Sequence, residues 1–258
     1  MKGYKAFKKG LICRGKQYQE NTVFEEAEAV ICKRGIHFCQ NPLDVLYYYD
    51  LVDDNGDVPE FADVEALDEA VTNDKKKFCT KKLRIGAKLS LKDFINASVS
   101  FLMESAKTED KAESKDFAQL ASSGDSAQLA SSGYNAKLAS SGYFAQLASS
   151  GNNAKLASSG NFAQLASSGN SAQLASSGDF AQLASSGNSA KLASSGENSV
   201  VAAIGFRNIA KASVGSWITL AEYTDEGIVT CVKTEQVDGK RIKADTFYRL
   251  QDGEFTEV

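Results

Sequence analysis

The side chains on which enzyme chemistry most often depends are scarce in this sequence. Its single histidine is His37, so a Ser-His-Asp or Cys-His catalytic arrangement would have to use that residue. Neither a P-loop nor a GxGxxG motif occurs, although these are the usual phosphate-binding signals of nucleotide-dependent enzymes. We therefore expect a protein that is not an enzyme and that carries no cofactor.

Long apolar runs and an excess of basic charge are absent as well. No eighteen consecutive residues are apolar, and the basic residues 1–10 precede no apolar segment of the kind found in signal peptides. The formal net charge is -4, and no segment is strongly basic. These observations predict a soluble, cytoplasmic protein that neither spans a membrane nor takes nucleic acid as its partner.

Cysteine pairs with the spacing of redox or zinc motifs are also missing. The five cysteines are an odd number, are widely spaced and include no CxxC pair, which suits reduced thiols in a cytosol. Cys32 and Cys39 flank His37, but their spacing is not that of a zinc knuckle. We expect no metal site here and interpret His37 as a half-buried strand residue.

What the sequence does contain is a repeat over residues 116–196. Nine copies of a nine-residue unit follow one another without insertion, from DFAQLASSG to NSAKLASSG. Positions three and five are always Ala and Leu around one polar residue, which is the alternation of a short strand with one buried face. Ser-Ser-Gly followed by Asn, Asp or Tyr is typical of turns. Each unit therefore predicts one strand and one corner.

A second period of eighteen residues runs through the repeat. From the third unit on, position two holds Phe in every other unit, and Phe117 in the first copy lies outside this alternation. Position four holds Lys only in units that lack Phe. We call these columns the phenylalanine ladder and the lysine ladder: Phe144, Phe162 and Phe180, and Lys137, Lys155 and Lys191. The pattern predicts a β-solenoid whose coil contains two strands, with rungs about 4.8 Å apart.

Two other structures have the same period or composition. Eighteen residues also make five α-helical turns, but each interior glycine would cost a helix about 1 kcal/mol. A disordered Ser/Gly-rich linker would not preserve the Ala-x-Leu register through nine units. The Ala-x-Leu kernel instead resembles pentapeptide-repeat proteins, although the spacing here is nine. The calcium-binding nonapeptide repeat is a poorer match, because its Gly-Gly-x-Gly-x-Asp turns are missing.

The segment before the repeat predicts a small α+β domain over residues 1–90. GIHFC at 35–39 is expected to form a strand, followed by a helix with Asn41 as its N-cap and Pro42 at its first position. A second helix over 91–107 is expected to cover the open first coil, as part of a capping helix and linker over 91–115.

The segment after the repeat predicts a second all-β region. Residues 197–215 read as a degenerate last coil, which extends the solenoid to 116–215. Residues 216–258 predict an antiparallel β-meander with turns at Asp238-Gly239 and Asp252-Gly253. The overall fold class is therefore mainly β, with a central solenoid between two flanking regions.

Motifs that run through nearly the whole chain resemble a family of uncharacterised proteins from bacteriophages and prophages of Gram-positive bacteria. They are MKGYKAF, CRGKQY, GIHFCQNPLDVLYYYD, the LASSG repeats, SWITLAEY and VKTEQVDGKRIKADTFYRL. The resemblance implies a phage-related origin and two flanks around a variable repeat. It implies no biochemical activity.

A second resemblance is confined to GIHFCQNPLDVLYYY, which is similar to the strand-helix element of ADP-ribosyltransferases. Gly35, Phe38 and either Tyr48 or Tyr49 would match the residues that pack around nicotinamide in those enzymes. The upstream His-x-Thr or Arg motif and a well-placed catalytic Glu are not found, so the resemblance implies an inactive module at most.

Three functional hypotheses follow, and all of them concern binding. In the first, the phenylalanine ladder points outward, the lysine ladder forms a solvated face that could also hold an anion, and this surface inhibits or sequesters a host protein or complex, such as one of host defence. In the second, a pocket around His37, Tyr47 and Tyr48 sequesters a small nucleotide signal. The third is a DNA mimic, which the neutral charge of the repeat disfavours. Homo-oligomers are compatible with each.

Overall fold

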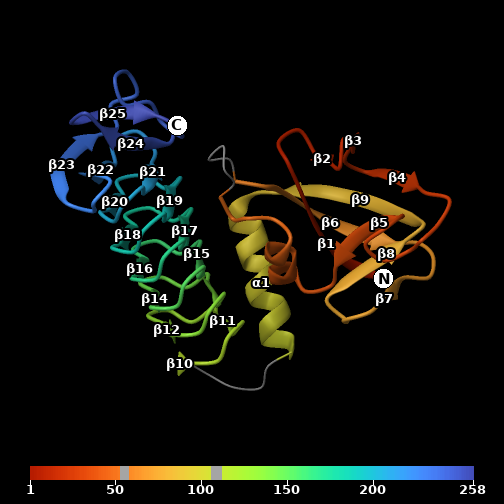
Figure 1. The fold of residues 1–258 in the computed structure, drawn as a ribbon. Coiled ribbons are helices and arrows are strands. Elements are labelled where there is room, and N and C mark those ends of the chain that lie inside the picture. The colour runs from red at the N-terminus through yellow and green to blue at the C-terminus, as the bar shows by residue number, and fades with distance from the viewer. Residues whose placement is uncertain (53–57, 106–111) are drawn as a thin grey trace. The chain divides into compact units, whose positions relative to one another are not determined.

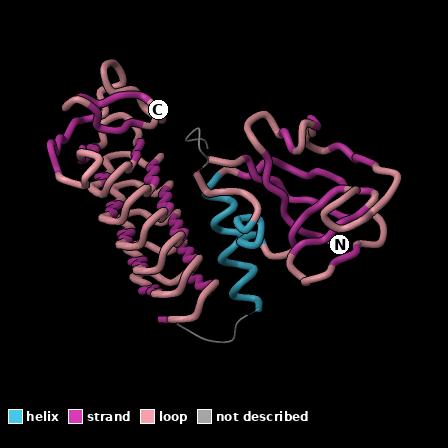
Figure 2. The backbone as a smooth tube through the Cα atoms, viewed as in Figure 1, coloured by secondary structure: helices cyan, strands magenta, loops and turns pink. Residues whose placement is uncertain are grey.

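The computed structural model describes residues 1–52, 58–105 and 112–258 and shows a mainly β protein (Figure 1). The described chain forms two compact units, the first ending at Phe101 and the second beginning at Leu102. Strands dominate both units (Figure 2). Within the described ranges, no helix is long and apolar enough to cross a membrane.

The first unit is built on a seven-stranded antiparallel sheet with the order β4-β9-β6-β1-β5-β8-β7. Its strands are β1 Lys2–Phe7, β4 Thr22–Glu25, β5 Ile36–Cys39, β6 Glu60–Ala66, β7 Val71–Thr72, β8 Lys77–Thr80 and β9 Lys82–Leu89. The short strands β2 Ile12–Cys13 and β3 Lys16–Gln17 form a separate hairpin. The strand expected at 35–39 is thereby confirmed as β5.

Helix α1, Leu91–Ser105, confirms the helix expected over 91–107. The side chain of Ser90 accepts from the backbone N–H of Asp93 at 3.1 Å, which caps its first turn. Phe94 is buried and stacks on Phe61 of β6, with ring centroids 3.8 Å apart. The apolar face of α1 thus contributes to the core of the first unit, and its role as a cover for the first coil stays a prediction.

The helix expected after Asn41 is a shorter 3-10 helix, η1, over Pro42–Tyr47. Its start is as expected: Asn41 Oδ1 accepts from the N–H of Leu43 at 3.1 Å, and Pro42 occupies the first turn. The tighter winding suits a six-residue segment, because 3-10 geometry is common in short pieces.

The second unit is a β-solenoid of about six turns over residues 119–220, as the repeat predicts. Odd and even strands form two parallel ladders whose registers join residues eighteen apart, such as Leu138 with Leu156 and Leu147 with Leu165. One ladder contains β10 Ala112–Glu113, β12 Gln128–Ser131, β14 Gln146–Ser149, β16 Gln164–Ser167, β18 Gln182–Ser185 and β20 Val200–Ala203. The other contains β11 Gln119–Ser122, β13 Lys137–Ser140, β15 Lys155–Ser158, β17 Gln173–Ser176, β19 Lys191–Ser194 and β21 Ile209–Lys211.

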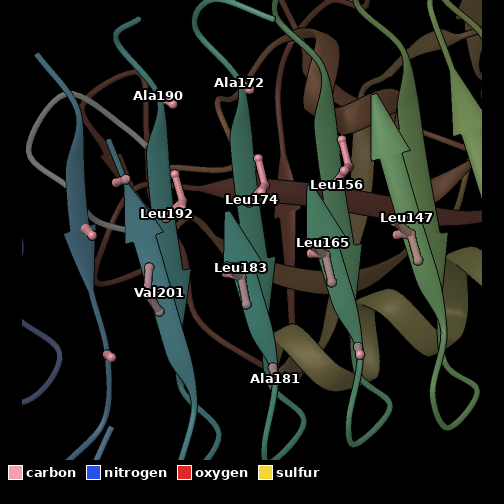
Figure 3. Packing of buried hydrophobic residues seen from close by; sticks show 14 of the residues in the cluster. Leu147, Leu156, Leu165, Ala172, Leu174, Ala181, Leu183, Ala190, Leu192 and Val201 are labelled. Carbon is pink, nitrogen blue, oxygen red and sulfur yellow. The ribbon is translucent and has the colours of Figure 1, made fainter. Parts of the chain in front are cut away.

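The solenoid interior consists of rows of identical side chains. The Ala of position three and the Leu of position five are buried throughout the repeat, and Figure 3 shows the leucines of successive strands in line. Fully burying one leucine is worth about 1.5–3 kcal/mol. Each coil therefore repeats the same small apolar contribution, and no single coil holds a large core.

The corners explain two further positions of the repeat. Position two has left-handed backbone in every unit, with φ between 52° and 61°, whereas the repeat glycines do not. The glycines are required for a different reason: a Cβ on Gly160 would lie 1.9 Å from the carbonyl oxygen of Gly142, one coil earlier. The Asn or Asp that follows Gly links the coils, as when Asn152 Oδ1 accepts from the N–H of Asn170 at 2.8 Å.

The antiparallel strands expected over residues 216–258 are present, and they continue the two ladders of the solenoid. Strands β22 Trp217–Tyr223 and β23 Val229–Gln236 extend one ladder, while β24 Tyr248–Gln251 and β25 Glu254–Glu257 extend the other. Between the two expected turns, only Tyr248–Gln251 forms a strand. The chain before it turns around Asp238, whose carboxylate accepts from two backbone N–H groups, those of Lys240 and Ile242.

Candidate functional site

The first unit contains a cavity of about 700 Å³ that is open to solvent. Strand β1, the β2–β3 hairpin, β5 and the residues after η1 contribute its walls. His37 and Tyr48, which the sequence places in a pocket, both line it. Tyr47 does not line it: the centroid of its ring lies 4.8 Å from Lys76 Nζ, and Tyr49 lines the wall instead.

The hairpin of β2 and β3 brings the side chains of Cys13 and Arg14 to this cavity. Cys13 pairs with Lys16, so Arg14 and Gly15 form a two-residue turn, and both have positive φ, 51° and 75°. That geometry is typical of a type I′ turn. Gly adopts a positive φ without steric cost, whereas Arg is strained there. Cys13 and Arg14 therefore both lie at the cavity wall.

Lys5 lies at the base of the site and is 5% exposed. Its ammonium donates to the carbonyl of His37 at 2.9 Å and lies 5.3 Å and 5.6 Å from the ring centroids of Phe7 and Tyr18. Burial lowers the pKa of Lys5 below its ordinary value, while the nearby Cys13 acts in the opposite direction. The site therefore contains a strongly desolvated cation.

His37 is held as a neutral imidazole. Its Nε2 accepts from the backbone N–H of Cys32 at 2.9 Å, so this nitrogen's lone pair is in use. Burial, followed by the positive charges of Arg14 and Lys5, lowers the pKa of His37 to about 4. In the described part of the chain, no three His, Cys, Asp or Glu side chains are grouped to hold a metal ion. These contacts fit a structural role for His37.

Basic and aromatic side chains dominate the remaining wall. Two acidic residues line it, and each is paired: Glu26 with Lys16 at 2.5 Å and Glu28 with Arg34 at 3.2 Å. Burial raises the pKa of Tyr48 to about 12, and Lys77 lies 4.1 Å from the centre of its ring. The basic and the aromatic lining residues are Lys5, Arg14, Lys16, Lys33, Arg34 and Lys77, and Tyr4, Tyr18, Phe38, Tyr48 and Tyr49.

The phenylalanine ladder of the second unit points outward, as its phase predicts. Its three side chains are between 42% and 53% exposed. Their rings stack nearly parallel, with centroids 5.0 Å apart for Phe144 and Phe162 and 4.9 Å apart for Phe162 and Phe180. All three occupy the left-handed position, which costs a bulky L-residue about 1–2 kcal/mol. An aromatic surface at a strained backbone position is a candidate binding surface.

The lysine ladder differs from the expected solvated face. Lys137 is 3% exposed, and Lys155 and Lys191 are half-buried. The repeat alone does not bury this position, since the equivalent Gln146 and Gln164 are exposed. All three lysines have interaction partners in the structure, so the ladder is not a set of free cations that face solvent.

Comparison with known proteins gives one match, and it falls on the unit that holds the cavity. Residues 1–97 match a family described as a domain of unknown function (DUF7666). No curated protein and no solved structure matches the chain. The matched range contains all the strands of the first unit and every residue that lines its cavity.

Proposed function

We propose that the first unit is a binding module for a small anionic, aromatic ligand of the nucleotide class, and that the protein sequesters this ligand without transforming it. The observation that carries the proposal is the cavity itself. Its volume suits a mononucleotide, its wall offers tyrosine rings for a base, and its basic side chains outnumber its acidic ones. Both acidic residues are already neutralised by ion pairs.

The resemblance to the ADP-ribosyltransferase element supports the same ligand class. Its matching residues, Gly35, Phe38, Tyr48 and Tyr49, all line the cavity. The two glutamates of the wall are bound to Lys16 and Arg34, and His37 uses its Nε2 to accept a backbone hydrogen bond. These contacts favour binding of a nucleotide over catalysis on it.

A ligand titration of the full-length chain tests this function. Calorimetry and thermal-shift measurements with ADP, ADP-ribose and cyclic dinucleotides would be compared with adenosine, which lacks phosphate. A ligand that binds only the folded state raises the melting temperature by mass action. We expect phosphorylated ligands to bind and Arg14→Ala to weaken them about tenfold, because a charge-assisted hydrogen bond is worth about 1.5–3 kcal/mol.

Lys92→Ala is the matched control, because it removes an exposed positive charge of the same unit that lies outside the cavity. An equal loss of affinity in the two variants would show a general charge effect. Failure of every phosphorylated ligand to bind would contradict the proposal.

The phenylalanine ladder favours a second candidate function, in which the protein binds a host protein or complex, as the phage resemblance suggests. We propose that the stacked rings contact an apolar surface of that partner, since exposed aromatic residues are enriched at protein interfaces. A chain with Phe144, Phe162 and Phe180 all changed to Asn should lose a partner that the wild-type chain retains. Retention of the same partner by both chains would argue against the ladder, and light scattering would show whether the partner is a second copy of the chain.

A further inference from the structure

Cys13 lies in an unusual chemical environment on the wall of the cavity. Its sulfur accepts from the hydroxyl of Tyr49 at 3.0 Å and from the ammonium of Lys5 at 3.5 Å. The residue is half-buried, so its sulfur is enclosed by donors on one side and lies beside the open cavity on the other. Hydrogen-bond donors and positive charge next to a sulfur favour the nucleophilic thiolate over the thiol.

The ammonium of Lys5 is the positive charge beside the sulfur of Cys13. Among the described residues, no carboxylate lies within ion-pair distance of its ammonium, and its polar contacts are Cys13 Sγ and the carbonyl of His37. A buried ammonium is costly unless a negative group compensates it. The sulfur of Cys13 is the side-chain group in contact with the ammonium of Lys5, so a negative charge on that sulfur would lie beside a buried cation. The buried lysine and the cysteine are therefore coupled.

The other cysteines lack this combination. Cys39 and Cys79 are buried, and Cys79 donates its proton to the carbonyl of Arg34 at 3.1 Å. Cys32 is exposed, whereas Cys231 belongs to the second unit and is half-buried. Within the described ranges, Cys13 is half-buried at the cavity wall, with the ammonium of Lys5 and the hydroxyl of Tyr49 directed at its sulfur, whereas Cys39, which also lines the cavity, is buried.

We propose that Cys13 is a reactive thiol that forms mixed disulfides with anionic low-molecular-weight disulfides in the cavity. The thiolate of Cys13 attacks one sulfur of the incoming disulfide, a new S–S bond forms, and the second half leaves as a thiolate that takes up a proton from water. The two sulfurs of the small disulfide supply the oxidising equivalents, so no other oxidant is required. Arg14, next to Cys13, attracts the negative charge of the reagent.

The first test measures how fast each cysteine of the native full-length chain reacts with iodoacetamide at pH 7, by peptide mass spectrometry after short exposures. Exposure alone predicts that Cys32 reacts first. The proposal predicts that Cys13 reacts about tenfold faster than Cys32, because the ammonium of Lys5 and the hydroxyl of Tyr49 stabilise negative charge on its sulfur. A rate at Cys13 equal to or below that at Cys32 would overturn the proposal.

The second test uses oxidised glutathione, an anionic disulfide, and the neutral bis(2-hydroxyethyl) disulfide. The wild-type chain should gain one glutathionyl group, at Cys13, and Arg14→Ala should slow the anionic reagent more than the neutral one. Modification at Cys32 instead, or equal slowing of both reagents, would contradict the assignment of the cavity charges.

Variants of the two donors, Tyr49 and Lys5, distinguish an effect on the reactivity of Cys13 from a loss of folded structure. Tyr49→Phe removes one donor to the sulfur and should lower the alkylation rate of Cys13 and shift its pH profile upward, whereas Tyr47→Phe, a neighbouring change outside the cavity wall, should not. Lys5→Met removes the ammonium but also alters the core, so Tyr49→Phe decides the case if Lys5→Met unfolds. An unchanged pH profile in Tyr49→Phe would contradict the proposal that the hydroxyl of Tyr49 activates the sulfur of Cys13.

These experiments use the same cavity as the proposed function but do not depend on its outcome. The alkylation rates are measured without nucleotide, and the nucleotide titrations are carried out with all cysteines reduced. Nucleotide binding without a fast Cys13 would refute only the thiol chemistry. A fast Cys13 without nucleotide binding would refute only the nucleotide proposal.

Discussion

The two units of this chain differ in how the sequence determines their structure. In the second unit every strand pairs with the strand eighteen residues away, so each side chain lies over its own equivalent. In the first unit β1 pairs with β5 on one side and with β6 on the other, and the neighbours differ at each position. The periodic unit fills its interior with Ala and Leu, whereas the irregular unit leaves a cavity.

Chemically distinctive residues follow the same division. The single histidine and four of the five cysteines belong to the first unit. The second unit instead repeats small and apolar residues and presents the phenylalanine ladder on its surface. From this contrast we propose a division of labour, with a ligand site in the first unit and an extended binding surface in the second.

Deletions that keep or break the eighteen-residue coil should have the largest effect. Removal of 144–161 takes out one full coil and restores every pairing, so the melting temperature should fall modestly and unfolding of the second unit should stay cooperative. Removal of 144–152 shifts all later strands to the opposite ladder and should cause loss of solubility or cooperativity. Thermal unfolding followed by circular dichroism compares the two, and equal behaviour would contradict the two-strand coil.

Adding one methyl group at a repeat glycine should disturb the contact between two successive coils of the second unit. In Gly160→Ala the new Cβ would meet the carbonyl oxygen of Gly142 at 1.9 Å, and the coils would have to separate. We expect destabilisation of about 3 kcal/mol or more, at the upper end of overpacking effects. Denaturant unfolding monitored by Trp217, the chain's single tryptophan and a residue of the second unit, measures it.

Gly124→Ala is the control for this substitution. Gly124 occupies the same sequence context, but its Cβ would meet only Ser122 Oγ at 3.6 Å. Its replacement should be neutral or should stabilise by up to about 1 kcal/mol, through the lower entropy of the unfolded chain. A large loss of stability at Gly124 would show that the glycines serve the turn conformation and not the contact between coils.

The parts of the fold that sequence predicts are those with a local or periodic signal. Ala-x-Leu alternation and the eighteen-residue period are sufficient for the solenoid, because every coil repeats the same environment. The left-handed conformation at Phe144 and its equivalents was not predicted, because Phe is a poor residue for that region. The close approach at Gly160 was also missed, since it depends on the coil below.

Only those cavity residues that lie close together in the sequence were predicted. His37 and Tyr48 lie close together in the sequence, and both line the cavity. Lys5 and Cys13 were missed because the sheet brings β1 and the β2–β3 hairpin to β5 through non-local pairings that no periodicity reveals. Arg14-Gly15 between two short polar segments is the signal of a tight turn that would have directed attention to Cys13.

Titration of His37 should destabilise the first unit alone. Its pKa is about 4 in the folded chain against an ordinary value of 6.5, so the unfolded chain takes up the proton first. The stability contributed by neutral His37 is complete above pH 6.5 and is lost as the pH falls from 6.5 toward 4. Denaturant unfolding of the first unit should show this slope, and His37→Gln should reduce it. A Trp217 signal with the same pH dependence would contradict the assignment to one unit.

A change within the phenylalanine ladder should have the smallest effect on stability. Phe162→Asn relieves left-handed strain of about 1–2 kcal/mol but loses two aromatic stacks of about 0.5–1.5 kcal/mol each. We expect a net change within about 1 kcal/mol, whereas Leu165→Ala in the same unit of the repeat should cost about 2–5 kcal/mol. Chemical denaturation measures both. Equal losses would show that the ladder is part of the structural core.

The division between a ligand cavity and an extended surface is tested most directly by hydrogen exchange of the full-length chain with and without ADP, read out by mass spectrometry. We expect slower exchange in peptides that contain Cys13 to Lys16 and Gly35 to Cys39, because these segments form the backbone around the cavity. We expect no change over residues 116–214. Protection within the repeat, or no protection in either unit at saturating ADP, would contradict this division.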